Sequence, residues 1–126
     1  MRAVDTNVLV RLVTRDERKQ VAAAESFVSK GAWVSTLVLI EATWVLTAVY
    51  DLAHADVAMA IDMLLHHRDL TIQEPDSVAA ALEQYRSRPA LGFSDCLILE
   101  RARKAGHLPV GTFDRNLSKL DGAEGL

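Results

Sequence analysis

Short apolar runs of strand type alternate along this chain with longer segments in which apolar residues recur at helical spacing. The strand-type runs are residues 2–4, 32–34, 70–72 and 108–112. The helical segments are residues 6–14, 16–30, 36–50, 54–67, 75–86 and 94–106, followed by a last helical turn at residues 114–120 and a frayed tail. Because single helices or helix pairs separate the strands, the pattern predicts an α/β fold with a mainly parallel sheet. Right-handed connections then bring the C-terminal ends of the strands to one edge.

Composition limits the kind of protein that this chain can be. Its 126 residues suit one domain, and its net charge of −3 gives no general attraction to nucleic acid, so polyanion binding would need local basic groups or metal ions. The single cysteine, Cys96, excludes an internal disulfide and fits a reducing compartment. No secretory signal follows Arg2, and Glu41 and Asp51 interrupt the one long apolar stretch. We therefore expect a cytoplasmic protein that does not bind membranes.

Two acidic residues follow strand-type runs. Asp5 comes directly after residues 2–4, and Asp114 follows residues 108–112 by a short step. Ligands of parallel α/β sheets bind beyond the C-terminal ends of the strands, so these carboxylates should meet at one edge. Both residues are equally good as helix N-caps, a role that needs no further chemistry.

Two further acids interrupt apolar helical faces. Glu41 has Leu37 and Trp44 at helical spacing, and Asp95 has Leu99 four residues onward. The sequence therefore predicts that both acids face the core. An arginine at the edge of the core could instead neutralise Glu41, and an acid in the first turn of a helix is favoured by the helix dipole whatever else it does.

Taken together, these four acids predict a metal site. No Lys or Arg lies at helical spacing on the apolar faces that hold Glu41 and Asp95. Four carboxylates in one cleft would repel each other unless a divalent cation neutralised them. Oxygen-only ligands favour Mg²⁺ or Mn²⁺ over zinc, and a hard metal with open positions suits the activation of water against a phosphodiester.

The segments that hold these acids resemble the PIN domain, and in particular the VapC toxins of bacterial toxin–antitoxin pairs. They read VDTNVLVRLV, STLVLIEATWVL, GFSDCLILERARKAG and VGTFDRNLSKL, and they stand in the family's order and spacing. The resemblance implies a single PIN-like domain over residues 1–126, with a central, mainly parallel sheet of four to five strands flanked by about six to seven helices. It also implies an endoribonuclease that depends on Mg²⁺ or Mn²⁺.

The resemblance assigns a role to each acid. Asp5, Glu41, Asp95 and Asp114 match the family's first to fourth acids. Asp5, Asp95 and Asp114 would hold the metal, while Glu41 would hold it or orient the attacking water. Hydrolysis would leave a 5′-phosphate and a 3′-hydroxyl.

Other residues match the family's supporting positions. The polar pair Thr6 and Asn7 follows the first acid, the hydroxyl residue Thr112 precedes the fourth, and Asn116 is a weaker match. Three arginines near the third and fourth acids are candidates for contacts with RNA phosphates, namely Arg86, Arg88 and Arg115.

The apolar helices in the middle of the chain predict binding partners. The helices between residues 36 and 67 are more apolar than a small monomer would bury, which predicts a homodimer interface and a groove for a partner segment. The resemblance implies that this partner is a VapB-type antitoxin.

Two alternative functions are a PIN-fold nuclease that acts on another nucleic acid and a non-catalytic PIN-fold binding module. A binding module would be expected to have lost one of the four acids. A phosphatase or receiver domain is disfavoured, because Asn7 and Val4 stand where a second acid would be needed.

Overall fold

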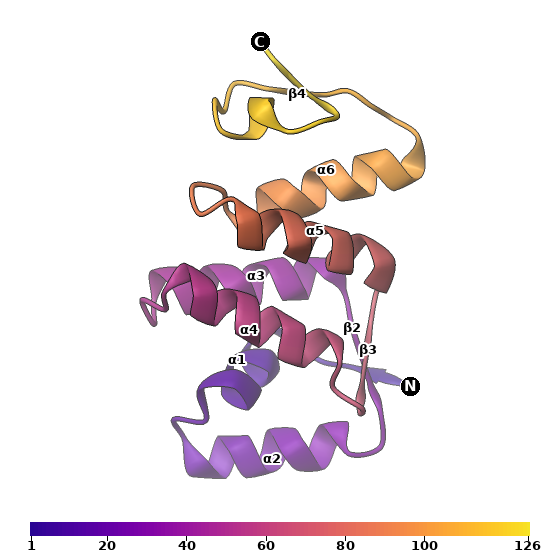
Figure 1. Ribbon diagram of the computed structural model, residues 1–126. Helices are drawn as coiled ribbons and strands as arrows, with labels where there is room; N and C mark the ends of the chain where they lie inside the picture. The colour runs from indigo at the N-terminus through magenta and orange to yellow at the C-terminus, as the bar shows by residue number, and fades with distance from the viewer. The chain divides into compact units, whose positions relative to one another are not determined.

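The computed structural model describes residues 1–126, and they form two units, Met1–Glu74 and Pro75–Leu126 (Figure 1). The first unit contains a parallel sheet in the order β1-β2-β3. Its strands are β1 (Arg2–Ala3), β2 (Ala32–Val34) and β3 (Leu70–Ile72). Strand β1 pairs with β2 on one side only, so β1 is an edge strand of this sheet.

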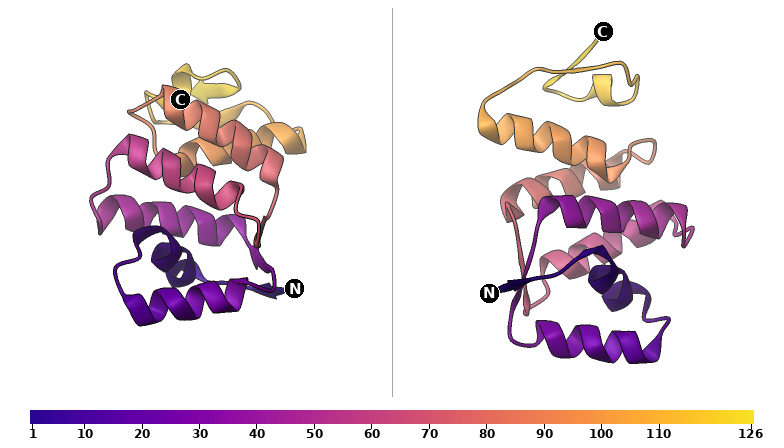
Figure 2. Two further views of the ribbon diagram at one scale, coloured as in Figure 1. Left: turned by 60° about the horizontal axis from the view of Figure 1, so that its bottom comes forward. Right: turned by 180° about the vertical axis from the view of Figure 1, so that it is seen from behind.

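Four helices complete the first unit. They are α1 (Thr6–Thr14), α2 (Arg18–Val28), α3 (Thr36–Ala48) and α4 (His54–Leu65). Figures 1 and 2 both show α1 lying between α2 and α3, and it packs against both. Leu9 of α1, Leu39 and Leu46 of α3 and Ile61 and Leu64 of α4 are fully buried, so apolar packing between the helices forms the core of this unit.

Helices α1 and α3 begin in the same way. Each starts two or three residues after the last residue of a strand, and a polar side chain caps it. Asp5 Oδ1 accepts a hydrogen bond from the backbone N–H of Val8 at 3.3 Å, and Ser35 Oγ accepts one from Val38 at 3.1 Å. Because such caps satisfy N–H groups that the helix leaves unpaired, they determine where each helix starts. The predicted starts of both helices are confirmed.

The second unit consists of two helices and a small sheet. Helices α5 (Pro75–Ser87) and α6 (Phe93–Ala105) lie side by side, with the rings of Tyr85 and Phe93 edge to face at 6.0 Å (Figure 1). Strand β4 (Val110–Thr112) is followed by the 3₁₀ turn η1 (Leu117–Lys119) and by β5 (Ala123–Gly125), which pairs in parallel with β4.

The predicted fold class is confirmed, with six α-helices and five strands that all pair in parallel. The five strands form a three-stranded and a two-stranded sheet instead of one sheet. With two or three residues each, they offer few main-chain hydrogen bonds to join further neighbours. None of the helices has the length and apolar character needed to cross a membrane.

The prediction of a frayed tail is wrong, because the tail forms β5. Gly122 has φ of 95°, a left-handed conformation that suits glycine, and it turns the chain back toward β4. The N–H groups of Val110 and Leu126 donate to the carbonyls of Gly122 and Thr112, both at 2.9 Å. Ala-Glu-Gly carries no β-branched or aromatic residue, so main-chain pairing defines this strand and side-chain pattern does not.

Candidate metal centre

Asp5 lies where the sequence predicts, between β1 and α1. It is exposed, and Oδ1 accepts the capping hydrogen bond from Val8. Its other oxygen, Oδ2, has no such bond, so the residue can cap the helix and still offer an oxygen to a ligand. The capping role and the site role are therefore compatible.

Glu41 does not face the core, which corrects the prediction. Its side chain is exposed, and so are two of its apolar neighbours, Leu37 at 72% and Trp44 at 64%. The buried face of α3 is formed by other residues, among them Leu39, Thr43 and Leu46. Helix α3 is apolar on nearly every side, so helical spacing alone could not show which side packs inward.

Asp95 lies in the first turn of α6 and is partly buried. Leu99, four residues onward, is fully buried, whereas Ile98 is half exposed, so the predicted core-facing position is only partly met. Burial and the nearby charge of Asp114 raise the pKa of Asp95, against a backbone hydrogen bond with Gly92 that lowers it. The charge of Asp114 therefore adds to burial in disfavouring the ionised form of Asp95.

Asp114 stands at the start of the loop that follows β4. Its Oδ1 accepts hydrogen bonds from the N–H groups of Asn116 at 2.8 Å and Leu117 at 2.9 Å. Thr112 Oγ1 in turn accepts one from the N–H of Asp114 at 3.0 Å. These local bonds hold the loop and leave Oδ2 of Asp114 without a hydrogen bond, as in Asp5.

The predicted supporting residues have different local roles. The side chain of Thr112 and the backbone of Asn116 both bond to Asp114 and hold its loop. Thr6 and Asn7 are the first two residues of α1, where Asn7 is exposed and Thr6 partly buried. Neither side chain makes a hydrogen bond within its unit, so a supporting role for this pair stays a prediction.

Cys96, beside Asp95, is buried and free of disulfide bonding. Burial, followed by the charges of Asp95 and Glu100, raises the pKa of its thiol to about 11. A thiol with that pKa is protonated at neutral pH and is a poor nucleophile, so Cys96 is a packing residue.

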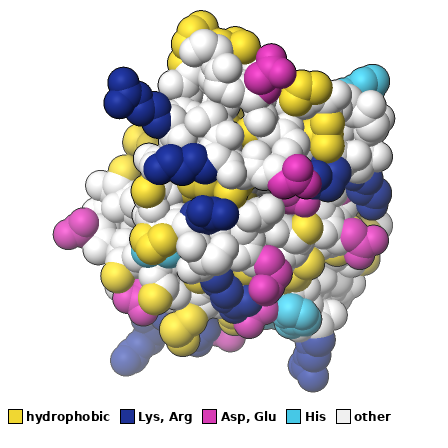
Figure 3. Space-filling model, turned by 45° about the horizontal axis from the view of Figure 1, so that its top comes forward, with side chains coloured by type: hydrophobic (Ala, Val, Ile, Leu, Met, Phe, Trp, Pro, Cys, Tyr) yellow, Lys and Arg dark blue, Asp and Glu magenta, His cyan; other side chains and the backbone are white.

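The three arginines predicted to contact RNA are exposed. Arg86 pairs with Glu83 at 3.3 Å, while Arg88 and Arg115 extend from loops. On the face shown in Figure 3, basic side chains are interspersed with acidic ones and form no continuous basic surface. This agrees with the net charge of −3 and favours a few individual phosphate contacts.

Phe113 is a candidate that sequence reasoning missed. It lies between Thr112 and Asp114, and 84% of its surface is exposed. The signal was present in the sequence as an aromatic residue directly before an acid in a polar loop. An exposed ring at such a place offers a face on which a nucleobase can stack.

The acids divide between the two units, with Asp5 and Glu41 in the first and Asp95 and Asp114 in the second. Neither unit gathers three metal-binding side chains by itself. Within its own unit, none of the four carboxylates pairs with Lys or Arg. Asp5 and Asp114 each keep one carboxylate oxygen without a hydrogen bond, and hard divalent cations prefer such oxygen ligands, so the donor type agrees with the predicted metal.

Comparison with known proteins identifies the family. The PIN domain family model matches residues 2–123, and the chain therefore belongs to the PIN domain family. This is a nuclease fold, and PIN domains are generally hydrolases that depend on divalent metal ions. Neither the curated proteins nor the solved structures contain a match to this chain.

Proposed function

We propose that this chain is an endoribonuclease dependent on Mg²⁺ or Mn²⁺ and the toxin, of the VapC kind, of a type II toxin–antitoxin pair. The observation that carries the nuclease assignment is the match of the PIN domain family model to residues 2–123. It is supported by Asp95 and Asp114, two family-pattern acids that have no basic partner in their unit. The toxin role rests on the resemblance of the four acid-bearing segments to VapC sequences.

The active arrangement joins all four acids in one site, so that residues 1–126 act as a single PIN domain. Asp5 and Asp114 support this in the same way. Each follows a parallel strand, uses one oxygen to hold the turn after it, and keeps the other free. Strand-end acids of this type are suited to meeting at one edge of an α/β fold.

The residues divide the chemistry among them. Asp5, Asp95 and Asp114 would hold the cation, and Glu41 would either hold it or accept a hydrogen bond from the attacking water and so align it. When bound, the cation would supply positive charge beside the phosphate and would make water a stronger nucleophile near neutral pH. Attack on phosphorus breaks the bond to the 3′ oxygen, which takes up a proton, and leaves a 5′-phosphate and a 3′-hydroxyl.

Contacts with the RNA come from the loops of the second unit. Arg88 and Arg115 are exposed and contact phosphates, as does Arg86 from the end of α5. Phe113, next to Asp114, stacks on an unpaired base beside the cleaved bond. Phe113→Ala should weaken binding of single-stranded RNA by about fivefold or more, whereas Phe113→Tyr should restore it. Equal RNA affinity of all three proteins would remove Phe113 from the site.

The partner surface is on α3 and α4, which pack together in the first unit. Their exposed apolar side chains include Leu37, Trp44 and, at 68% exposure, Met59. Apolar side chains exposed on adjacent helices suit a second copy of the chain and an amphipathic antitoxin segment in the cytoplasm. Light scattering should give a dimer mass for wild type and a lower mass for Met59→Ser. A monomer at every concentration would contradict the dimer.

Cleavage of RNA tests the function directly. Purified protein should cut single-stranded RNA when Mg²⁺ or Mn²⁺ is present, and excess EDTA should stop it. A DNA strand of the same sequence should stay intact, whereas cleavage of both strands would indicate a nuclease of broader specificity. The RNA fragments should carry 5′-phosphates at the cleaved ends.

Matched variants make the test specific to the site. Asp95→Asn should lower the cleavage rate by about 100-fold or more while leaving the circular dichroism spectrum unchanged. Asp76→Asn is the control, because Asp76 is an exposed acid of the same unit whose contact is with Lys104 at 3.9 Å. Full activity of Asp95→Asn, or equal losses in both variants, would contradict the proposed site.

A further inference from the structure

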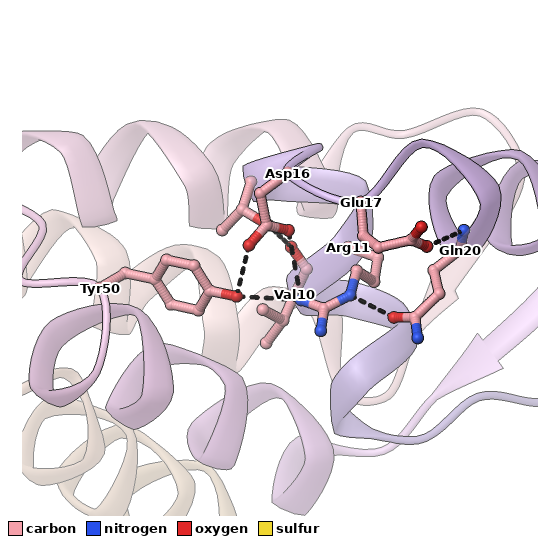
Figure 4. A network of polar contacts seen from close by, with 7 residues as sticks. Val10, Arg11, Asp16, Glu17, Gln20 and Tyr50 are labelled. Atoms are coloured by element: carbon pink, nitrogen blue, oxygen red, sulfur yellow. Dashed lines mark hydrogen bonds and ion pairs between the residues drawn. The ribbon is translucent and has the colours of Figure 1, made fainter.

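A polar network joins three helices of the first unit (Figure 4). Arg11 Nη1 donates to Tyr50 Oη at 2.9 Å, and Tyr50 Oη donates to Asp16 Oδ2 at 2.9 Å. Asp16 Oδ1 accepts from Thr14 Oγ1 at 2.8 Å, and Arg11 Nε donates to Gln20 Oε1. Both carboxylate oxygens of Asp16 and the hydroxyl of Tyr50 therefore have partners in the network.

The residues of this network come from three regions of the sequence: the end of α1, the start of α2 and the segment after α3. Arg11 is in the last turn of α1, Asp16 lies in the loop between α1 and α2, and Gln20 is in the first turn of α2. Tyr50 comes two residues after the end of α3, where its N–H donates to the carbonyl of Val45 at 3.2 Å. The network thus ties the far end of α1 to the far end of α3.

The near ends of these two helices are held differently. Strands β1 and β2 are paired, the N–H of Val4 donates to the carbonyl of Trp33 at 3.2 Å, and each helix starts from a capped position just beyond its strand. Asp5 is the cap of α1, and Glu41 is the sixth of the 13 residues of α3, slightly nearer its start than its end. Asp5 is separated from Arg11 by about 9 Å along the helix axis and Glu41 from Ala48, the last residue of α3, by about 10.5 Å, at 1.5 Å per residue.

Helix α1 has only nine residues, a length at which an isolated helix is not stable in water. Its direction relative to α3 is therefore set by what holds its two ends and by the core between them. If the far end were released, α1 could tilt about its strand, and the carboxylates of Asp5 and Glu41 would change their relative position. We infer that the network of Arg11, Asp16 and Tyr50 is a positioning device that maintains the spacing between Asp5 and Glu41.

This inference rests on the proposed function, because it matters only if Asp5 and Glu41 serve one metal site. It adds positioning residues that touch neither substrate nor metal. Arg11 suits the role through its planar fork, which reaches Gln20 with Nε and Tyr50 with Nη1 at once. A lysine would keep the charge but could not make both bonds in this geometry, so Arg11→Lys separates positioning from a mere need for positive charge.

The test is the affinity of the full chain for Mn²⁺, measured by electron paramagnetic resonance of the free ion without RNA. Tyr50→Phe removes one oxygen atom from the network, and Arg11→Lys removes its fork. Each should raise the apparent Kd for Mn²⁺ by about threefold or more at a temperature where circular dichroism shows a folded protein. The double variant should raise it by less than the product of the two single effects, because both act through one network.

Arg15→Gln is the matched control. Arg15 also follows α1 and pairs with Glu25 of α2 at 3.3 Å, but it makes no bond to the end of α3. The Arg15→Gln substitution should lower the stability of the protein without changing its Kd for Mn²⁺. Wild-type affinity in both Tyr50→Phe and Arg11→Lys, or an equal loss in Arg15→Gln, would overturn the inference while leaving the proposed function in place. Absence of Mn²⁺ binding by wild type would overturn both, and if Arg11→Lys does not fold, Tyr50→Phe decides.

Discussion

Two carboxylates, one in each unit, have opposite surroundings. Asp16 accepts hydrogen bonds from Thr14 and Tyr50, which lower its pKa, and Arg11 lies 3.3 Å away. Asp95 is partly buried beside Asp114 with no basic partner in its unit, and these surroundings raise its pKa. The charge of Asp16 is thus satisfied by the fold, whereas the charge of Asp95 is not.

Under the proposed function, Asp16 serves the structure and Asp95 serves a ligand. A fold that only needed to be stable would gain nothing from two acids placed to repel each other. A fold that must bind a cation gains affinity from that arrangement. The two carboxylates should therefore respond oppositely when their charge is removed or when metal is added.

The largest expected difference is the response to metal. Mg²⁺ or Mn²⁺ at about 100 times Kd should stabilise wild type by about 2.7 kcal/mol and raise its Tm. Asp95→Asn should lose most of this stabilisation, because the variant lacks a ligand for the ion. Asp76→Asn should keep all of it. Thermal melts of the three proteins with and without metal measure the effect, and equal shifts in all three would remove Asp95 from the site.

A smaller difference is expected without metal, and its sign should reverse between the two acids. Asp95→Asn should raise the free energy of unfolding at neutral pH by roughly 0.5 kcal/mol, allowing for screening by water, because a raised pKa means that the fold disfavours the charge. Asp16→Asn should lower it, because the charged form is the one that the fold favours. Urea unfolding in EDTA measures both, and changes of the same sign would contradict the comparison.

The smallest effect is the pH dependence of the Asp16 network. The folded-state pKa of Asp16 lies below its ordinary value of 3.8, so its stabilisation is present above that value and is lost as pH falls through the folded-state pKa. The Tm difference between wild type and Asp16→Asn should therefore be constant near neutral pH and disappear as the pH falls below the folded-state pKa of Asp16. A difference that persists in acid would assign the effect to hydrogen bonding alone.

Much of the fold could be predicted because local chemistry determines it. Residues 6–14 were predicted as a helix capped at Asp5 or Thr6, and α1 has those bounds with Asp5 as its cap. Strands β2 and β3 also match their predicted ranges. A capping side chain at a strand end, or a short apolar run between polar turns, carries its signal within a few residues.

What could not be predicted depends on tertiary contacts. The side of α3 that carries Glu41 is as apolar as the buried side, so the sequence pattern placed Glu41 inward and the structure places it outward. Strand β5 has no side-chain signal, because backbone pairing with β4 defines it. The network around Arg11 and Tyr50 joins residues 39 apart in the sequence, and no local pattern reveals it.

Some parts of the candidate site could be predicted from the sequence, and others could not. The four acids were recognised by position and resemblance, and in the structure burial and the charge of Asp114 raise the pKa of Asp95. Their union with Asp5 and Glu41 stays a prediction. Phe113 was missed because the search of the sequence concentrated on charged residues. Its exposure beside Asp114 became apparent only from the structure.

The most direct test of the account is Mn²⁺ binding by single-acid variants from both units. Calorimetry should detect Mn²⁺ binding to wild type and weaker binding, by about tenfold or more, to Asp5→Asn and Glu41→Gln from the first unit and to Asp95→Asn and Asp114→Asn from the second. Losses in variants of both units would show that the two pairs of acids form one metal site. Loss confined to the variants of one unit, with wild-type affinity in the others, would contradict it.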